Sequence, residues 1–401
     1  MSKNRLIVIS NHFPPEIGGG SSRMLELIQS LSRFHKLYLI TRVPYINDYN
    51  LYFSFKTIKF GNLNVNKVKL GIFKYLDALN ICNYPLILLY FLYLLRISRK
   101  DFKILISTPP PEPLFAAWLF SKFFKNKIVL DLRDNWVDVN IEKSNGIIRI
   151  QNVIIKIFYK KFIKSIKLII SVNDHIIRKV RKIANNNKGY ILPNIPNLEV
   201  FSPDNKISRK SLDIDSETLV ITYAGNLSAD YINIEPFLNS LKYLKDKNIK
   251  FFIIGEGSLI RKYKVLIKKH GINDLVIFLG RQNKDYIAKI YSISDICLVP
   301  LSFDEVYEYA IPSKIFEIMA CRKAVFGLGP KNGELEKLIV KNKLGYFISE
   351  ENEKKISDIL LNLCIDKKIL KEFGNNGYKL IKSEYNYSSL VKNLSKLINN
   401  L

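Results

Sequence analysis

Cysteine and histidine are scarce in this chain. Its 401 residues include four of each, and no two cysteines form a Cys-x-x-Cys pair. The cysteines are scattered in apolar surroundings, and His175 and His270 lack the spacing of metal ligands. This pattern is typical of a protein from a reducing cytoplasm, and we predict no structural metal.

Long apolar runs are also missing. The longest, residues 84–95 (YPLILLYFLYLL), has 12 residues, whereas a bilayer-spanning helix needs about 20. This run could form a buried or half-buried helix, or a helix that dips into a membrane face. Basic residues on both sides favour an anionic surface. They are Lys67, Lys69, Lys74, Arg96, Arg99 and Lys100.

Acidic residues are few, above all in the first half of the chain. Residues 1–196 contain 31 Lys+Arg against 11 Asp+Glu, a net charge of +20. The other 205 residues contain 31 and 25, a net charge of +6. The first half therefore either meets an anionic partner or is simply kept soluble by its charge. Nucleic acid, an acidic membrane surface and a phosphorylated substrate are the candidate partners.

We do not expect the start of the chain to be a secretion signal. Its short apolar run, residues 5–10, soon gives way to polar residues, so we interpret it as a first strand. Similar short runs alternate with helical spacing through the chain, which is typical of parallel sheets in βαβ units. The others are residues 36–41, 103–108, 127–132, 167–172, 219–225, 250–257, 275–281, 296–301 and 323–329.

This alternation pauses at residues 190–206, which contain three prolines and several asparagines. A chain of this length exceeds one ordinary core, so the pause marks a domain boundary. We predict an α/β fold with two Rossmann-like domains facing across a cleft, residues 1–195 and 196–384. A last helix, about 385–401, is expected to pack back on the first domain. Ligands of such sheets bind beyond the carboxyl ends of the strands.

The first predicted strand is followed by an unusual glycine-rich loop. The chain has neither Gly-x-Gly-x-x-Gly there nor a Walker Gly-Lys-[Ser/Thr]. Instead, Gly18, Gly19 and Gly20 precede Ser21 and Ser22. The glycines would let the backbone approach a ligand, and the serine amides would face an anion at a helix start. Phosphate contact and a merely flexible loop are both compatible with this pattern.

A second candidate site is the stretch IPSKIFE. Pro312 suits the first turn of a helix, and we expect the amides of Ser313, Lys314 and Ile315 to point out of the helix start. Together with the Lys314 ammonium they predict a diphosphate site. Glu317 follows on the same helical face, where its carboxylate could accept hydrogen bonds from ribose hydroxyls. The alternative is an ordinary helix cap with a surface Lys–Glu pair.

With five other stretches, this one resembles the family 4 glycosyltransferases of the GT-B fold, of the type that builds bacterial surface polysaccharides on a lipid carrier. The resemblance implies a retaining transferase with a nucleotide-diphosphate sugar held mainly by the C-terminal domain. It also implies transfer of a hexose or N-acetylhexosamine in lipopolysaccharide or capsule synthesis. The other stretches are PPEIGGGSSR (14–23), LDLRDNW (130–136), YAGNLS (223–228), FFIIGEGSL (251–259) and FLGR (278–281).

The resemblance also assigns roles in donor binding. Glu317 matches the second glutamate of the family's Glu-x7-Glu element and would bind the ribose. The first glutamate is replaced by Tyr309, with Glu308 one residue away. Asn226 stands where many members have arginine, which leaves Lys314 and Arg281 as candidate partners of the phosphates.

The other family positions concern the base, the transferred sugar and the acceptor. Gly280 and Arg281 match the loop whose backbone would contact the uracil edge. Arg133 stands where members often have histidine, and Asp134 follows it. Both are candidates to touch sugar hydroxyls or, for Arg133, the leaving phosphate; a structural Arg–Asp pair is the alternative. His12 and Glu16 are possible acceptor contacts.

The expected chemistry requires no metal. The only Asp-x-Asp motif, residues 213–215, falls in a polar stretch that we interpret as a loop. Positive groups would stabilise the charge that grows on the leaving phosphate, and in this family that phosphate can take the acceptor's proton. We therefore expect a UDP-sugar donor, a lipid-linked acceptor and no cofactor.

The expected location is cytoplasmic, peripheral on the inner face of the plasma membrane. The basic N-terminal domain, including residues 156–167, would meet an anionic lipid surface. Two other functions remain open. A sugar-nucleotide epimerase would need acid–base carboxylates in the cleft and no acceptor. A nucleic-acid-binding protein would need an exposed platform of interleaved aromatic and basic residues, which residues 156–167 fit only superficially.

Overall fold

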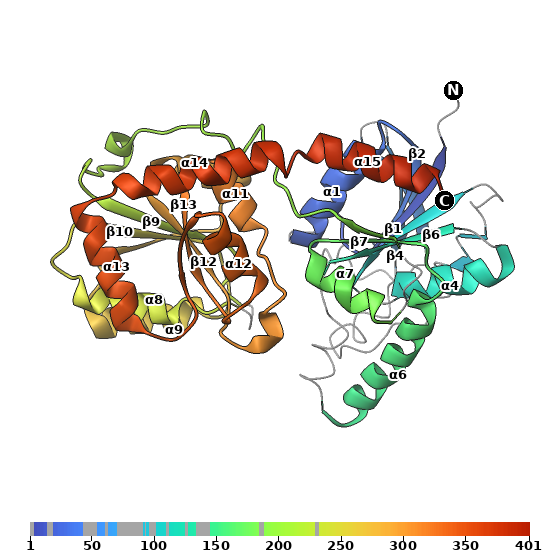
Figure 1. Ribbon diagram of the computed structural model, residues 1–401, viewed down its shortest axis with the longest axis horizontal. Coiled ribbons are helices and arrows are strands. Elements are labelled where there is room, and N and C mark those ends of the chain that lie inside the picture. Colours follow the sequence, from blue (N-terminus) through green and yellow to red (C-terminus); the bar gives the residue numbers. More distant parts are fainter. Residues whose placement is uncertain are drawn as a thin grey trace. The chain divides into compact units, whose positions relative to one another are not determined.

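The computed structural model forms two compact units (Figure 1). Unit 1 is Met1–Asn194 with Tyr387–Leu401, and unit 2 is Ile195–Asn386. The boundary lies one residue before the one predicted from the prolines. The structure describes residues 4–13, 19–42, 54–60, 63–69, 91–92, 94–95, 102–109, 112–124, 127–133, 145–183, 188–228 and 232–401.

Unit 1 is built on an eight-stranded sheet in the order β3-β4-β2-β1-β5-β6-β7-β8. Neighbouring strands are parallel except β3 and β4, which pair antiparallel at one edge. The five strands predicted in this half are confirmed as β1, β2, β5, β6 and β7. The strands are β1 (Arg5–Ser10), β2 (Lys36–Arg42), β3 (Ser54–Phe60), β4 (Leu63–Lys69), β5 (Lys103–Thr108), β6 (Lys127–Leu132), β7 (Leu168–Ser171) and β8 (Lys188–Ile191).

The C-terminal helix belongs to unit 1, where it packs on the first helix (Figure 1). Its apolar positions Val391, Leu394 and Ile398 are buried in one core with Met24 and Leu27. Polar contacts add to this packing, because His35 Nε2 lies 2.9 Å from Ser395 Oγ. The helices in the described part of unit 1 are α1 (Gly19–Leu31), α4 (Glu112–Phe124), α6 (Gly146–Ile163), α7 (Asp174–Arg181) and α15 (Tyr387–Asn399).

Unit 2 has a six-stranded parallel sheet in the order β11-β10-β9-β12-β13-β14. Counted from β9, this is the 3-2-1-4-5-6 order of a dinucleotide-binding fold, whose direction of winding switches between β9 and β12. All five strands predicted in this half are confirmed, and β14 is additional. The strands are β9 (Leu219–Ala224), β10 (Ile249–Ile254), β11 (Val276–Gly280), β12 (Ile296–Pro300), β13 (Ala324–Leu328) and β14 (Gly345–Ile348).

Helices cover both faces of the unit 2 sheet, which explains why its strands are apolar on both sides. One core joins the sheet to α8, α9 and α13, and another joins it to α10, α11, α12 and α14. Figure 1 shows the two layers. The helices are α8 (Glu235–Ser240), α9 (Ile260–His270), α10 (Lys284–Ile293), α11 (Lys314–Ala320), α12 (Glu334–Lys341), α13 (Glu353–Ile365) and α14 (Lys368–Ser383).

No helix in the described part of the chain is long and apolar enough to cross a bilayer. The longest described apolar helix, α6, is interrupted by basic residues. The apolar run 84–95 lies mostly outside the described residues. Whether it forms a buried helix or one that dips into a membrane face therefore stays a prediction.

Two loops at the carboxyl ends of β9 and β10 pack backbone against backbone. A Cβ on Gly255 would lie 1.9 Å from the carbonyl oxygen of Gly225. Because that oxygen belongs to the backbone, it cannot move aside as a flexible side chain would. Glycine at 255 is therefore required for the close packing of these two loops.

We expect Gly255→Ala to lower the free energy of unfolding by about 3 kcal/mol, the upper end for overpacking. Gly280→Ala is the matched control. Its Cβ would meet nothing within 4 Å, and only its φ of +62° is unfavourable, which costs about 1 kcal/mol. Urea unfolding of both variants measures the difference, and equal losses would contradict the packing argument.

Candidate active site

The predicted donor residues of unit 2 lie at the switch point of its sheet. β9 ends at Ala224 and leads directly into Gly225 and Asn226, whereas β12 leads through a longer connection to α11. The Lys314 ammonium reaches back to β9, because a Cβ on Gly225 would lie 2.5 Å from Lys314 Nζ. The carboxyl ends of the two central strands thus bring together residues that are about ninety positions apart in the sequence.

Tyr223 forms the floor beneath this lysine. Lys314 Nζ lies 4.1 Å from the centre of the Tyr223 ring, a cation–π contact. The Tyr223 side chain is fully buried, and its hydroxyl donates a 2.8 Å hydrogen bond to the carbonyl oxygen of Asn226. Sequence reasoning missed Tyr223, although its place two residues before the glycine that ends β9 is a usable signal.

Lys314 and Glu317 occupy the first turn of α11, and both are half-buried. Burial lowers the pKa of Lys314 to about 7, although the nearby Glu317 opposes this shift. Burial raises the pKa of Glu317, while Lys284 and Lys314 act in the opposite direction. The lysine is therefore close to half-protonated at neutral pH, and an arriving anion would draw a proton onto it.

Tyr291 on α10 is a second side chain that sequence reasoning missed. It is completely buried, and its hydroxyl finds no hydrogen-bond partner among the described residues. Burial raises the pKa of Tyr291 well above its ordinary value, and the negative charge of Glu317 adds to this shift. The phenol therefore remains a neutral donor beside the Glu317 carboxylate.

One detail of the predicted diphosphate site is wrong. The amide of Ile315 does not point freely out of the helix start, because it donates a 3.1 Å hydrogen bond to the carbonyl oxygen of Pro312. The chain enters α11 through this tight turn, and Ser313 makes no side-chain capping bond. Charge at the site therefore depends on Lys314 rather than on a row of three free amides.

The remaining donor candidates of unit 2 also follow the carboxyl ends of strands, and two of them, Asn226 and Arg281, are exposed. Gly280 ends β11, the edge strand, and Arg281 after it is exposed. The Gly280 carbonyl oxygen accepts a 2.8 Å hydrogen bond from the Gly255 amide. Asn226 is exposed, and its side-chain oxygen accepts from the Ser228 amide at 2.7 Å, so it stabilises the loop after β9.

The structure also shows how Tyr309 differs from the glutamate that it replaces. Tyr309 is buried, whereas Glu308 is exposed. The backbone oxygen of Glu308 accepts a 2.6 Å hydrogen bond from the Glu334 amide at the start of α12. A change of register that placed Glu308 at the site would break this contact.

In unit 1, Arg133, Gly20 and His12 come together where β1, β5 and β6 end. A Cβ on Gly20 would lie 1.8 Å from Arg133 Nη1 and 3.5 Å from His12 Cβ. The Arg133 guanidinium also donates to the carbonyl oxygen of Pro109. Gly20 is thus needed to let the guanidinium lie on the start of α1, which the three-glycine pattern could not reveal.

Other unit 1 predictions are only partly placed. Gly19 is the first residue of α1. Ser21 is buried, and its hydroxyl has no hydrogen-bond partner within the described ranges. Asp134 and Glu16 lie outside the described residues, so their expected ligand contacts stay predictions, as does the alternative of a structural Arg133–Asp134 pair.

A buried ion pair supports this part of unit 1. Arg23 Nη2 lies 2.7 Å from Asp131 Oδ1, and Arg23 Nη1 donates to the carbonyl oxygen of Leu192 at 2.7 Å. Ser107 Oγ donates to the other carboxylate oxygen at 3.1 Å. The network joins α1, β5, β6 and the end of β8 just below the candidate residues. Sequence reasoning missed it, although an aspartate inside the apolar strand KIVLDL is a signal.

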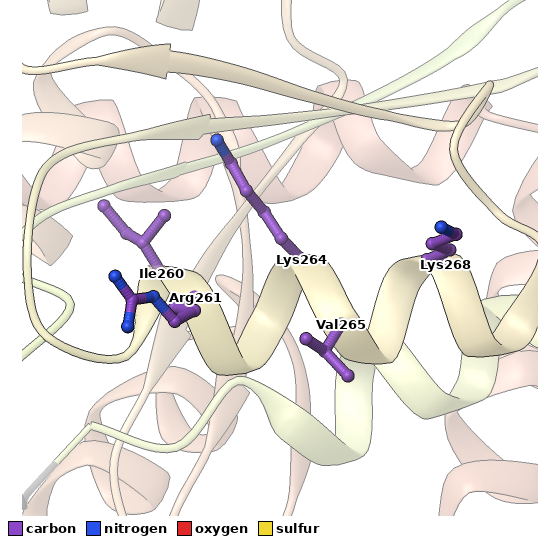
Figure 2. A pocket seen from close by; sticks show the side chains of 5 residues that line it. All are labelled: Ile260, Arg261, Lys264, Val265 and Lys268. Atoms are coloured by element: carbon purple, nitrogen blue, oxygen red, sulfur yellow. The ribbon is translucent and has the colours of Figure 1, made fainter.

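Unit 2 also has a shallow surface pocket along α9. Figure 2 shows its five lining side chains projecting from this one helix. None of the predicted donor residues belongs to it, and its polar groups are cationic, with no acid or nucleophile. The lining residues are Ile260, Arg261, Lys264, Val265 and Lys268.

Within the described ranges, no group of His, Cys, Asp or Glu side chains is arranged to hold a metal ion. This finding does not test the residues outside those ranges. The expectation of metal-independent chemistry therefore stays a prediction.

Sequence comparison relates the chain to known transferases. The family model "Glycosyl transferases group 1" matches residues 204–380, which lie within unit 2. The lipopolysaccharide 1,2-N-acetylglucosaminetransferase of Salmonella typhimurium strain LT2 is 27% identical over 203 residues. That match covers 48% of this chain and 51% of the relative, so it extends over about half of each protein.

Two solved structures share the fold over nearly their whole length. Sucrose-phosphate synthase from Thermosynechococcus elongatus has a TM-score of 0.78 at 15% identity, covering 99% of both chains. HepE of Anabaena, solved in complex with UDP and glucose, has a TM-score of 0.70 at 12% identity and the same coverage. At these identities the likeness shows the fold alone, which is GT-B. The family match, the curated relative and the shared GT-B fold together make this chain similar to glycosyltransferases of the GT-B type.

Proposed function

We propose that the protein is a retaining family 4 glycosyltransferase. It transfers a hexose or N-acetylhexosamine from a UDP-sugar to a lipid-linked or oligosaccharide acceptor in bacterial surface polysaccharide synthesis. The observation that carries the proposal is the position of Lys314 over Tyr223 at the switch point of the unit 2 sheet, with Glu317 in the same turn of α11. Open α/β sheets bind nucleotides at this point.

In this proposal the donor is held by one turn of α11. The diphosphate lies at the Lys314 ammonium, and the ribose hydroxyls donate to Glu317 a turn later. The positive Lys314 suits the negatively charged diphosphate. The Glu317 carboxylate would repel phosphate, but it can accept hydrogen bonds from the ribose hydroxyls. Backbone groups near Gly280 would contact the base, with Arg281 and Asn226 at the rim.

UDP is the proposed nucleotide because of the relatives. HepE, which shares the fold, was solved with UDP and glucose. The Salmonella relative is named for the transfer of N-acetylglucosamine. The HepE complex supports a uridine nucleotide, and both proteins support a hexose-type sugar.

The proposed reaction breaks the bond between the anomeric carbon and the diphosphate oxygen. A new bond forms between that carbon and an acceptor oxygen, on the same face, and the leaving phosphate takes the acceptor's proton. Negative charge grows on the phosphate as its bond breaks, and protonated Lys314 stabilises it. No protein nucleophile, general base or metal is assigned.

The acceptor is proposed to meet unit 1, whose sequence accounts for most of the net charge. Arg133 lies on Gly20 beside His12, where it could contact the transferred sugar or the leaving phosphate. Asp134 and Glu16 are proposed contacts in the adjoining segments. A basic unit 1 suits a lipid diphosphate at an anionic membrane. The enzyme would be a peripheral protein on the cytoplasmic face of that membrane.

A thermal-shift screen of UDP-, GDP- and dTDP-sugars tests the donor assignment. A ligand at 100 times its Kd adds about 2.7 kcal/mol to the stability of the folded state. We expect a UDP-sugar to raise the melting temperature by several degrees in EDTA, with smaller shifts for the others. A larger shift with GDP or dTDP, or a strict need for divalent ions, would contradict the proposal. Conversion of the sugar without an acceptor would indicate an epimerase instead.

A further inference from the structure

Helix α6 of unit 1 exposes a concentration of large apolar side chains. Ile147 is 84% exposed and Ile150 is 63% exposed. Side chains of this kind are normally scattered singly over a protein surface, whereas a contiguous group marks an interaction site. The members of the group on α6 are Ile147, Ile148, Ile150, Val153, Ile154, Ile157 and Phe158.

The exposed group forms a stripe along the helix. Ile147, Ile150, Ile154 and Ile157 follow one another at spacings of three, four and three residues, which places them on one face. The opposite face already serves unit 1, since its side chains are buried. These are Asn152, Ile155, Tyr159, Phe162 and Ile163. The helix is therefore apolar on two opposite sides, and its anchoring in unit 1 accounts for only one of them.

A neighbouring helix fixes α6 in this orientation. The Phe158 ring lies 5.9 Å from the Phe115 ring and 6.3 Å from the Trp118 ring of α4. Phe123, near the end of α4, is itself 68% exposed. The stripe thus stands on a packed support, and the adjacent helix also exposes a large apolar side chain.

The charges beside the stripe are all of one sign. Arg149, Lys156 and Lys160 follow at spacings of seven and four residues, along one flank of the exposed face. No acidic residue occurs from residue 145 to residue 173. An apolar stripe with a basic flank is the pattern of a helix that lies in the interface of an anionic membrane.

A second copy of α6 fits this surface less well. Isoleucines at alternating spacings of three and four could also pair two helices in a short coiled coil. The next position of that pattern is Lys161, however, and every charge that flanks it is basic. Two such helices would bring like charges together, whereas an anionic bilayer matches them.

We propose that α6 docks unit 1 on an anionic lipid bilayer. Ile147, Ile150, Ile154 and Ile157 enter the boundary between headgroups and acyl chains, and Arg149, Lys156 and Lys160 contact the headgroups. The helix lies on the membrane, because its basic residues exclude a spanning position. The inference rests on the proposed function in one respect, namely that the acceptor is held in that membrane.

Sedimentation with lipid vesicles tests the docking without any turnover. The parent protein is expected to bind vesicles with 30 mol% phosphatidylglycerol in phosphatidylcholine, and to bind pure phosphatidylcholine weakly. Ile150→Asp with Ile154→Asp should weaken binding about tenfold or more, since two buried isoleucines are lost. The matched control is Val340→Asp with Ile365→Asp, which changes two exposed apolar side chains of unit 2 and should bind as the parent does.

A second variant separates charge from apolar insertion. Arg149→Gln with Lys156→Gln and Lys160→Gln should reduce binding to the anionic vesicles and make it less sensitive to salt. Equal binding of the parent to both kinds of vesicle would overturn the proposal, as would parental binding by the two-aspartate variant. So would a parent that is dimeric without lipid and becomes monomeric in that variant, which would assign the stripe to a second copy.

Two further measurements keep the result interpretable. The melting temperatures of the variants should stay close to that of the parent, because every substituted side chain is exposed except that of Lys156, which is half-buried. A UDP-sugar should stabilise the α6 variants as it does the parent, because none of the proposed donor contacts lies on α6. If the parent binds vesicles but a UDP-sugar does not raise its melting temperature, only the donor assignment is refuted. If a UDP-sugar raises the melting temperature but the parent does not bind vesicles, only the docking is refuted.

Discussion

Replacing Glu317 by alanine is expected to raise the Kd for UDP about 10- to 100-fold and to remove most of the thermal shift. Hydrogen bonds to a charged group contribute about 1.5–3 kcal/mol. The Glu317 carboxylate is half-buried on α11, so it competes for ribose hydroxyls with little water around it. Isothermal titration of UDP into parent and variant measures the loss.

The same experiment can assign the contact to the ribose. If Glu317 accepts from the ribose hydroxyls, then 2′,3′-dideoxy-UDP should bind the parent weakly. It should bind Glu317→Ala about as well as UDP does, because the two changes remove the same interaction. Additive losses would place the carboxylate elsewhere on the nucleotide, and equal UDP affinity in parent and variant would rule out the ribose assignment.

Glu305→Ala is a suitable control for this variant. Glu305 is exposed in the short 3-10 helix Glu305–Tyr307, on the connection between β12 and α11. Its loss changes the same net charge without touching α11. Burial raises the pKa of Glu317, so the ionised side chain does not favour the fold, and Glu317→Ala should not melt earlier than the parent in the absence of ligand.

The fold was predictable because its core strands are apolar on both faces. Runs such as RLIVIS and KFFII can only be buried parallel strands when helical segments lie between them. The strands that we did not predict lack such a continuous apolar run. β3 and β4 alternate polar and apolar residues and pair antiparallel at an edge, and β8 and β14 are short edge strands.

The candidate site was predictable where it is local in the sequence. Lys314 and Glu317 share one helical turn, so their spacing alone predicted a common face. Tyr223 and Tyr291 come from β9 and α10, and no local pattern links them to α11. The Ile315 amide was wrongly predicted as free because the tight turn from Pro312 depends on how the connection enters the helix.

Replacing Lys314 by methionine is expected to lower kcat about 10²- to 10³-fold, the usual effect of removing one group that stabilises the charge of a transition state. Methionine keeps the length and apolar stem of the side chain but carries no charge. Lys331→Met, which changes an exposed lysine of unit 2, is the control and should retain parental kcat. A Lys314→Met enzyme with parental kcat would remove the lysine from the mechanism.

The ligand-free variant should also be more stable than the parent. The pKa of Lys314 is about 7 in the folded protein against an ordinary value of 10.5. Below pH 7 the folded state must hold a buried charge, which opposes folding in full. Between pH 7 and 10.5 the folded protein is already neutral at Lys314 while the unfolded chain is still protonated, so the cost declines as the pH rises. The gain in melting temperature from Lys314→Met should therefore be largest below pH 7 and shrink at alkaline pH.

The same titration predicts how donor affinity depends on pH. Above pH 7 most of the ligand-free protein has a neutral Lys314, so binding of the diphosphate must take up a proton. The Kd of a UDP-sugar, whose own charge is constant in this range, should rise by up to about tenfold per pH unit above 7. Lys314→Met should show a weak and nearly constant affinity between pH 6 and 9. A parent whose affinity is equally constant would show that the ammonium does not bind the diphosphate, whatever its effect on stability.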